Sequence, residues 1–334
     1  MKRVVVTGGT GFVGANLVRR LLREGHEVHL LVRRDHTTWR IREIADHVRS
    51  HEVDLTARRA LRRVLATIRP DWVFHLAAYG AYSWQQDRRR MVRTNVLGTM
   101  NLLDASLEAG CETVVNSGSS SEYGLKSIAP GEDEALEPNS EYGVTKAAAS
   151  LYGRHLARSR RARIFTLRLY SVYGPFEDPD RLIPRLVRCG LEGRLPPLAS
   201  PDTARDYVYV DDVADAFLSV AERPDAAEPG AIYNVGTGVQ TSLREVVDLA
   251  RKTLGIVKEP RWRSMPDRSW DTAVWVANIE KIRREVGWIP KYTLTEGFSA
   301  AARWLREGDP KGDRRSRERP DVSGPFGTPA QRRA

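Results

Sequence analysis

The sequence predicts an α/β fold: a Rossmann-type doubly wound parallel sheet with a smaller, interleaved C-terminal substrate-binding region. Two observations support this prediction. Up to about residue 170, apolar β-rich runs alternate with amphipathic stretches, and such alternation builds a parallel sheet with helices on both faces. The first apolar run, at 4–7, passes directly into a glycine-rich turn that opens an amphipathic stretch.

The individual elements follow from the same patterns. Apolar runs rich in β-branched and aromatic residues predict strands at 4–7, 28–32, 72–76, 113–116 and 164–169. Amphipathic stretches predict helices at 14–24, 57–68, 91–109 and 142–159. Ligands of such sheets bind beyond the carboxyl ends of the strands, so we expect the functional residues to meet there.

The chain is expected to divide into three parts. Residues 1–170 are predicted to form a dinucleotide-binding Rossmann domain, to which part of the 205–240 region returns. Residues 171–308 are predicted to form a smaller region over the carboxyl edge of the sheet, with short helices at 211–222, 242–254, 278–286 and 294–306. Residues 309–334 hold seven Lys or Arg against four Asp or Glu and have no apolar period, which predicts a disordered basic tail.

Composition narrows the class of function. The 334 residues are 41% hydrophobic and 29% charged, as in a globular protein, and no apolar run approaches the ~20 residues of a membrane helix. No signal peptide precedes the first strand, which favours the cytoplasm. The net charge of +10 favours anionic partners, but no basic stripe is interleaved with aromatics. A phosphate-bearing small molecule therefore fits better than a nucleic acid, and the two cysteines have no metal-binding spacing.

The glycine-rich turn predicts a dinucleotide site. Gly8 allows the tight turn, Gly11 lets the backbone approach a pyrophosphate, and Gly14 lets the helix pack on the strand. The helix N-terminus that follows is a ready site for the pyrophosphate anion. The expected cofactor contacts of the turn are Gly8, Thr10, Gly11, Phe12, Val13 and Gly14.

The end of the second strand indicates which dinucleotide binds. NAD sites usually place an acidic residue there, whereas this chain has Val32 followed by Arg33 and Arg34. Arginine makes charge-assisted, often bidentate bonds to phosphate, which favours the 2′-phosphate of NADP(H). The alternative is NAD, with both arginines simply solvated. Asp54, after a later strand, is a candidate adenine contact.

Tyr142 and Lys146 form a candidate catalytic pair. On a helix, residues i and i+4 share one face, so the phenol and the ammonium can reach the same volume. A cation ~4 Å away, at an effective dielectric of ~20, contributes about 4 kcal/mol. We therefore expect Lys146 to lower the pKa of Tyr142 by up to about three units from ~10. A phenol beside a cation and a dinucleotide can help to move a hydride on or off an alcohol carbon.

Several motifs together resemble one family. They are Thr7–Gly14, His75–Ala78, Thr94–Thr99, Ser117–Gly124, Tyr142-x-x-x-Lys146, Arg168–Pro175, Arg205–Asp212 and Val286–Pro290. In this order, over about residues 1–307, they resemble the extended short-chain dehydrogenase/reductases, in particular the nucleotide-sugar epimerases, dehydratases and 4-ketoreductases. The resemblance implies a nucleotide-diphosphate sugar as substrate and a homodimer joined by two helices of each subunit.

The resemblance also implies roles for single residues. The catalytic hydroxyl of the family would be Ser119, and Arg205 resembles an arginine that contacts the diphosphate, with Arg263 or Arg268 as a second contact. In the motif Arg168–Pro175, Ser171 replaces the asparagine that the family usually has at this position. The remaining cofactor positions are Leu55, Leu76, Ala77, Ala78, Asn95, Ser117, Tyr170 and Val172, and the remaining substrate positions are Tyr79 and Ser120.

The reaction is open between several members of the family. The 4,6-dehydratases have an acidic residue just after the catalytic hydroxyl, where this chain has Ser120 and Ser121, and Glu122 should lie on the opposite side of an extended segment. The arginine pair favours an NADPH-dependent reductase of a nucleotide-diphosphate 4-keto-sugar, with Tyr142 as proton donor. The alternative is an NAD-dependent nucleotide-sugar 4-epimerase. A dehydratase and a non-catalytic dinucleotide-sensing regulator are lesser alternatives.

Overall fold

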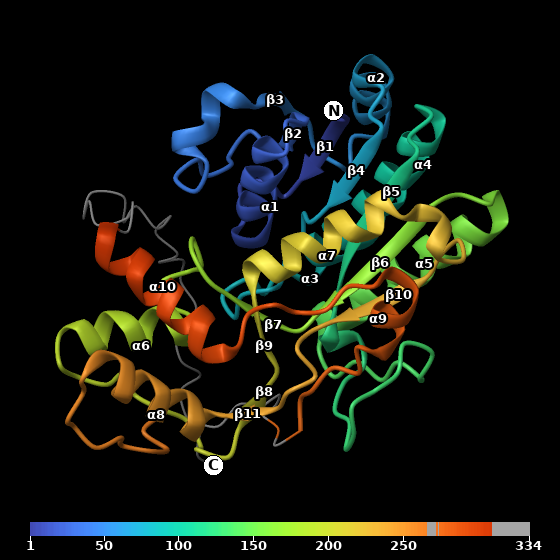
Figure 1. Cartoon of the computed structure of the whole chain (residues 1–334). Coiled ribbons are helices and arrows are strands. Elements are labelled where there is room, and N and C mark those ends of the chain that lie inside the picture. Colours follow the sequence, from blue (N-terminus) through green and yellow to red (C-terminus); the bar gives the residue numbers. More distant parts are fainter. Residues whose placement is uncertain (266–271, 273, 309–334) are drawn as a thin grey trace, which may run out of the picture.

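The computed structural model describes residues 1–265, 272 and 274–308. Its centre is a seven-stranded parallel sheet with the order β10-β6-β5-β4-β1-β2-β3 (Figure 1). The strands are β1 (Arg3–Thr7), β2 (Glu27–Val32), β3 (Arg49–Glu52), β4 (Trp72–His75), β5 (Thr113–Ser119), β6 (Ile164–Leu169) and β10 (Ile232–Val235). The order reverses beside β1, so the predicted doubly wound topology is confirmed.

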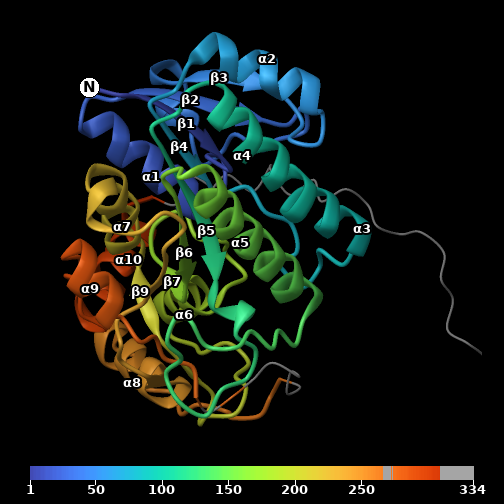
Figure 2. The ribbon, with the colours of Figure 1, turned by 90° about the vertical axis from the view of Figure 1, so that its right-hand side faces the viewer.

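Helices cover both faces of the sheet (Figures 1 and 2). On one face, α1 (Phe12–Arg23) packs beside α7 (Val210–Glu222), and the core between them and the sheet includes Val4, Leu17 and Phe217. The other face carries α2 (Arg58–Ile68), α4 (Thr99–Glu108) and α5 (Glu141–Arg160). The core strands are buried on both faces, which explains why they are continuous apolar runs.

The helix predicted at 91–109 has three parts. It begins earlier, as α3 (Arg88–Met91), continues as a π-helical segment η2 (Val92–Gly98), and ends as α4. Gly98 packs against Leu55, where a Cβ atom would come within 3.1 Å of the leucine Cβ. A π-helical turn often marks a functional position, and this one carries Asn95.

The C-terminal region returns to the sheet and also builds a core of its own. β10 pairs with β6, and a short parallel pair joins β7 (Ser171–Tyr173) to β9 (Tyr207–Tyr209). The short strands β8 (Ala204–Arg205) and β11 (Thr241–Ser242) pair antiparallel. The helices α6 (Leu182–Leu191), α8 (Leu243–Leu254) and α10 (Leu294–Gly308) enclose a third apolar cluster, and α9 (Glu280–Val286) lies beside β10.

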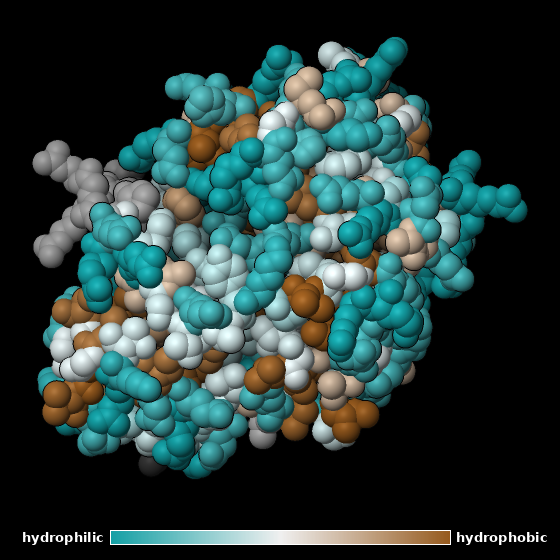
Figure 3. All heavy atoms as spheres, viewed as in Figure 1, coloured by the Kyte–Doolittle hydropathy of each residue, from teal (hydrophilic) through white to brown (hydrophobic). Residues whose placement is uncertain are grey.

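One helix of this region was not predicted. The helix α6 forms although it contains Pro184, because this proline lies in the first turn, where its missing N–H breaks no helical bond. Figure 3 shows that the face of the molecule in this view is largely hydrophilic, with apolar side chains gathered at the lower left, over α6 and α8. Among the described helices, none combines the length and the apolar character needed to cross a membrane.

Candidate active site

The glycine-rich turn joins β1 to α1 at the carboxyl edge of the sheet. Gly8 has φ +70°, and a Cβ there would lie 2.6 Å from the backbone of Leu76 and Ala77. A Cβ on Gly14 would lie 2.2 Å from the carbonyl oxygen of Gly8, so helix and turn touch through backbone alone. Gly11 is the N-cap of α1 and offers no side-chain cap.

The first turn of α1 therefore presents backbone N–H groups without a capping side chain or an acidic residue. This turn, formed by Phe12, Val13 and Gly14, fits an anionic pyrophosphate because the helix dipole and the open donors both favour negative charge. Thr10 lies at the same turn and is partly exposed. The residues present fit the dinucleotide that the sequence predicts.

The end of β2 has the features expected from the sequence. Val32 is buried, whereas Arg33 and Arg34 are exposed beyond the strand, and Asp35 lies 3.7 Å from the Arg33 guanidinium. Asp54 follows β3, and its carboxylate accepts hydrogen bonds of 2.7 Å from the N–H and the hydroxyl of Thr56. These bonds, the backbone one first, lower the pKa of Asp54 and keep it ionised.

The residues after β4 are fixed from two sides. The N–H of Ala77 donates to the hydroxyl of Thr7 at 3.2 Å. Asn95 pairs with both backbone groups of Tyr79 at 2.8 Å and donates to Thr145 of α5 at 2.9 Å. Asn95 therefore connects the loop after β4 to the helix that carries Tyr142. Leu76, Ala77, Ala78 and Tyr79 lie together along this loop, and the carbonyl of Leu55 accepts from Asn101 at 3.0 Å.

The predicted catalytic residues meet at the carboxyl end of β5. Ser119 ends this strand, and Tyr142 and Lys146 lie on the first two turns of α5. The ammonium of Lys146 donates a hydrogen bond to the carbonyl oxygen of Ser117, and the Ser119 side chain is in hydrogen-bond contact with the phenol. Gly143 permits this approach, because a Cβ there would lie 2.5 Å from the Ser121 carbonyl oxygen.

The expected pKa shift of Tyr142 is wrong in direction. Burial is the largest influence and raises the pKa of Tyr142 to about 12, while Ser119 lowers it through its hydrogen bond. Lys146 is itself buried, and burial lowers its pKa to about 8. Desolvation is the largest influence on both groups, and the charge that acts most on Tyr142 is that of Glu122, which raises its pKa further, not that of Lys146 on which we based the expectation.

Glu122 is engaged in a buried ion pair rather than free. Residues Ser120–Glu122 form a 3₁₀ turn, not the extended segment that we expected, and the Glu122 carboxylate turns back to accept from the N–H of Ser119 at 2.8 Å. It also accepts from Arg168 at 2.8 Å and from Ser150 at 2.9 Å. Glu122 and Arg168 are at most 1% exposed.

The predicted substrate residues come from several segments. Pairing of β7 with β9 sets Ser171 opposite Tyr207, and the N–H of Ser171 donates to the carbonyl of Asp206, next to Arg205. Tyr170 is buried, and Val172 is half-buried in β7. Arg263 is exposed in a turn and has a φ of +54°. Its N–H donates to the carbonyl of Ala199 at 3.2 Å. Arg268 lies outside the described residues.

Trp275 was missed by the sequence analysis. Its indole N–H donates to the Ser120 hydroxyl at 3.2 Å, and the Arg205 guanidinium lies 5.3 Å from its ring centroid. Ser120, Tyr170 and Trp275 line one small pocket. The signal was weak, because a single aromatic residue outside a periodic segment has no distinctive spacing. Trp275 nonetheless connects the serine run to the predicted diphosphate arginine.

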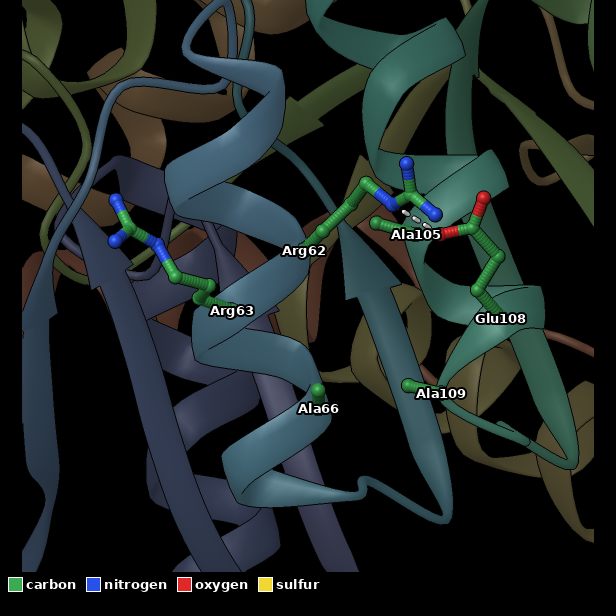
Figure 4. Close-up of a pocket in the computed structure, with 6 residues that line it drawn as sticks. All are labelled: Arg62, Arg63, Ala66, Ala105, Glu108 and Ala109. Carbon is green, nitrogen blue, oxygen red and sulfur yellow. Dashed lines mark ion pairs between the residues drawn. The ribbon is translucent and has the colours of Figure 1, made fainter.

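A second hollow, of about 340 Å³, lies between α2 and α4 (Figure 4). Arg62 and Glu108 form an ion pair across it, and Ala66, Ala105 and Ala109 leave the space between the helices. The C-terminal part of α4 lies toward the amino ends of the strands, so this hollow is remote from the catalytic edge.

Comparison with known proteins decides the family. Residues 4–236 match the model of the NAD dependent epimerase/dehydratase family. The chain belongs to this family. The fold, the family and the enzymatic character that the sequence predicted are therefore confirmed.

Members of the NAD dependent epimerase/dehydratase family are similar along nearly the whole chain. A UDP-glucose 4-epimerase of Mycolicibacterium smegmatis is 31% identical, with 91% of this chain and 98% of that protein covered. A dTDP-glucose 4,6-dehydratase of Streptomyces griseus is also 31% identical, with 91% and 94% covered. The crystal structure of a UDP-glucose 4-epimerase of Thermus thermophilus in complex with NAD has a TM-score of 0.79 at 31% identity, with 91% and 99% covered.

Proposed function

We propose that this protein is a nicotinamide-dependent nucleotide-sugar 4-epimerase. Among similar proteins, 4-epimerases and 4,6-dehydratases are both represented, and a 4-keto-sugar reductase is not specifically supported. The residues that follow Ser119 favour one of the two reactions, epimerisation, over dehydration. Ser120 and Ser121 stand where the dehydratases have an acidic residue, and Glu122 is held by Arg168. This arrangement favours epimerisation, which needs no elimination of water.

Three residues of the catalytic edge carry the proposed reaction. A nicotinamide dinucleotide, when bound, takes up a hydride from sugar C4 and returns it to the opposite face, so no net oxidation results. Tyr142 would accept the proton of the C4 hydroxyl as the hydride leaves and give it back to the ketone oxygen as the hydride returns, and its raised pKa favours the second of these steps. Ser119 orients that oxygen, and Lys146 holds the phenol and the ribose in place.

We propose residues 171–308 as the region that binds the nucleotide sugar. Arg205 fits a diphosphate because a guanidinium can bond two phosphate oxygens at once. Ser171, whose N–H donates to the carbonyl of Asp206, next to Arg205, and Ser120, whose hydroxyl accepts from Trp275, are further polar groups for the same substrate. UDP-glucose is the first candidate substrate because relatives and structural neighbours carry its name.

The arginines after β2 support NADP(H) as the cofactor. Val32 is buried and cannot accept bonds from the ribose hydroxyls, whereas Arg33 and Arg34 are exposed and can bind a 2′-phosphate. NAD is the alternative, and the structural neighbour from Thermus thermophilus is a complex with NAD. The same arginines make the NADPH-dependent 4-keto-sugar reductase the second candidate function.

Replacing Arg33→Asp tests the cofactor assignment. The new carboxylate repels a 2′-phosphate and accepts from a ribose diol, so NADPH should bind about tenfold or more weakly and NADH more tightly. Titration of each dinucleotide into the protein, followed by intrinsic fluorescence, measures the change in affinity. The control is Arg42→Asp, because Arg42 is an exposed arginine further along the same segment of the chain. A variant that still prefers NADPH would contradict the assignment.

We further propose a homodimer formed through η2 and α5. Val92 and Leu97 of η2 and Val144 and Leu151 of α5 expose large apolar side chains, and these two elements pack side by side. Val144 and Leu151 are seven residues apart and share one face of the helix. A second copy of the same surface would remove these side chains from water.

A further inference from the structure

Phe176 has a backbone conformation that needs an explanation. Its φ is +66°, in the left-handed region that bulky residues rarely adopt. It lies just after β7, in the segment Gly174–Glu177, and its side chain is buried. Such a conformation persists only where the surrounding contacts over-determine it. The contacts of Phe176 are therefore informative.

Aromatic and cationic groups from three distant segments enclose the Phe176 ring. The Arg19 guanidinium of α1 lies 3.7 Å from the ring centroid. Trp304 of α10 lies 4.7 Å away, and Trp39, in the segment after β2, lies 6.3 Å away, centroid to centroid. The ring thus joins the helix of the cofactor turn to the C-terminal region.

Two backbone carbonyls of the segment that contains Phe176 accept hydrogen bonds from side chains of the dinucleotide-binding domain. Arg40 donates from Nε to the Phe176 carbonyl at 2.8 Å, and Asn16 donates to the Pro175 carbonyl at 3.0 Å. Arg19 donates to the Arg40 carbonyl at 2.6 Å. Arg40 is only 8% exposed, so its bond is made away from water, where it is stronger. Burial is the largest influence on the pKa of Arg40 and lowers it, and Asp178 and Glu177 are the carboxyl groups that oppose this shift.

The position of these contacts matters for the cofactor. β2 and β6 are four places apart in the sheet, about 19 Å at ~4.8 Å for each step. The segments that follow β2 and β7 nevertheless touch, beside the first two turns of α1. A dinucleotide in a sheet of this kind extends along the carboxyl edge, past the N-terminus of that helix. The contact between Arg40 and Phe176 therefore lies beside the helix whose N-terminus a bound dinucleotide would pass.

The loop after β4 approaches the same place. Burial raises the pKa of Tyr82, and the nearby Arg40 guanidinium opposes that rise. Glu177, next to Phe176, is buried, and burial raises its pKa to about 8, so it adds little negative charge near Arg40 at neutral pH. The loops that follow β2, β4 and β7 thus converge.

We propose that Arg40 and Phe176 form a clasp that closes the cofactor groove and keeps the dinucleotide bound between turnovers. The inference rests on the proposed epimerase, which uses one dinucleotide for both hydride transfers, whereas a reductase exchanges it in every turnover. Arg40 and Phe176 act as positioning residues: they hold the two segments together and touch neither reacting atom.

The rates of NADPH release and association test the clasp. Wild type, Arg40→Met and Phe176→Leu are loaded with NADPH, and its fluorescence is followed after mixing with excess NADP⁺. We expect Arg40→Met to release NADPH about tenfold faster or more and also to bind it faster, because an opened clasp eases passage in both directions. Phe176→Leu, which keeps an apolar side chain in the buried site, should show an intermediate acceleration.

Matched controls make the outcome decisive. Arg42→Met removes an exposed arginine two residues away and should leave both rates within about twofold of wild type. Release within about twofold of wild type in both clasp variants would overturn the proposal, and so would faster release with unchanged association, which indicates lost direct contact. The measurement uses no sugar, so an absence of epimerase activity would be recognised separately in the sugar assay.

Discussion

At the scale of single residues, burial at the catalytic edge shifts the pKa values of two titratable groups in the direction that favours their neutral forms. Burial raises the pKa of Tyr142 to about 12 and lowers that of Lys146 to about 8. The sequence shows that the two residues share a helix face, but not how far each is removed from water. The phenol is thus protonated at neutral pH, which is the form that donates to a ketone oxygen.

The Tyr142→Phe variant tests whether the phenol transfers the proton. We expect kcat to fall by about 10²–10⁴, because general acid–base catalysis typically contributes that much. Dinucleotide affinity should stay within about twofold, since the ring remains. Tyr152→Phe, on the same helix and bonded to Asp104, is the control. Unchanged turnover in Tyr142→Phe would favour a non-catalytic regulator.

The Lys146→Met variant should separate stability from function. The pKa of Lys146 in the folded protein, about 8, lies below its ordinary value of 10.5. The buried charge therefore lowers the free energy of unfolding of wild type below pH 8, and this loss disappears as the pH rises from 8 to 10.5. We expect the variant to be inactive, yet about 2 kcal/mol more stable at pH 7, with the difference shrinking above pH 8. Urea unfolding at several pH values measures this. A variant less stable than wild type at pH 7 would disprove it.

At the scale of elements, the turn after β5 is held together by one buried ion pair. Glu122 bonds the N–H of Ser119, the hydroxyl of Ser150 and the Arg168 side chain of β6. Arg168 also donates to the Tyr123 hydroxyl at 2.7 Å and to the Glu132 carbonyl at 2.9 Å. This network fixes the position of Ser119 relative to α5.

The Glu122→Gln variant should therefore lower the stability of the fold. It leaves the Arg168 charge buried without a counter-charge, which typically costs about 3 kcal/mol or more of unfolding free energy. The double variant Glu122→Gln with Arg168→Met should recover part of the loss, because no unpaired charge remains. If Glu122→Gln kept full stability but lost activity, Glu122 would instead act as a catalytic acid and the dehydratase would regain support.

The sequence predicts elements well where periodicity is strong and poorly where distant packing decides. β6 and the helix of Tyr142 were expected almost to the residue because apolar burial and spacing determine them. The helix α6 was not predicted, although its Pro184 lies in the first turn, where proline is tolerated. Trp275 and Arg40 were missed because their significance arises from partners far away in the chain, Ser120 and Phe176, and no local pattern indicates such contacts.

At the scale of the whole molecule, the exposed apolar side chains on η2 and α5 predict the assembly. We expect Leu151→Glu to shift a homodimer toward monomer, because it places a charge in the apolar surface that the partner would cover. Light scattering after size-exclusion chromatography measures the mass. Leu191→Glu, an exposed apolar residue at the end of α6, is the control. A wild-type protein that is monomeric at micromolar concentration would contradict the proposed homodimer.

The central claim is that this chain returns to the sugar the hydride it removes. The most direct measurement incubates the purified protein, without added cofactor, with the glucose conjugates of UDP, dTDP, GDP and CDP, and follows the products by chromatography and NMR. We predict that one pair of C4 epimers, first of all UDP-glucose and UDP-galactose, interconverts to equilibrium with no net oxidation. Accumulation of a 4-keto-6-deoxy sugar would contradict the account. So would an absence of interconversion together with stoichiometric oxidation of NADPH in a parallel sample that is given NADPH and a nucleotide-diphosphate 4-keto-sugar.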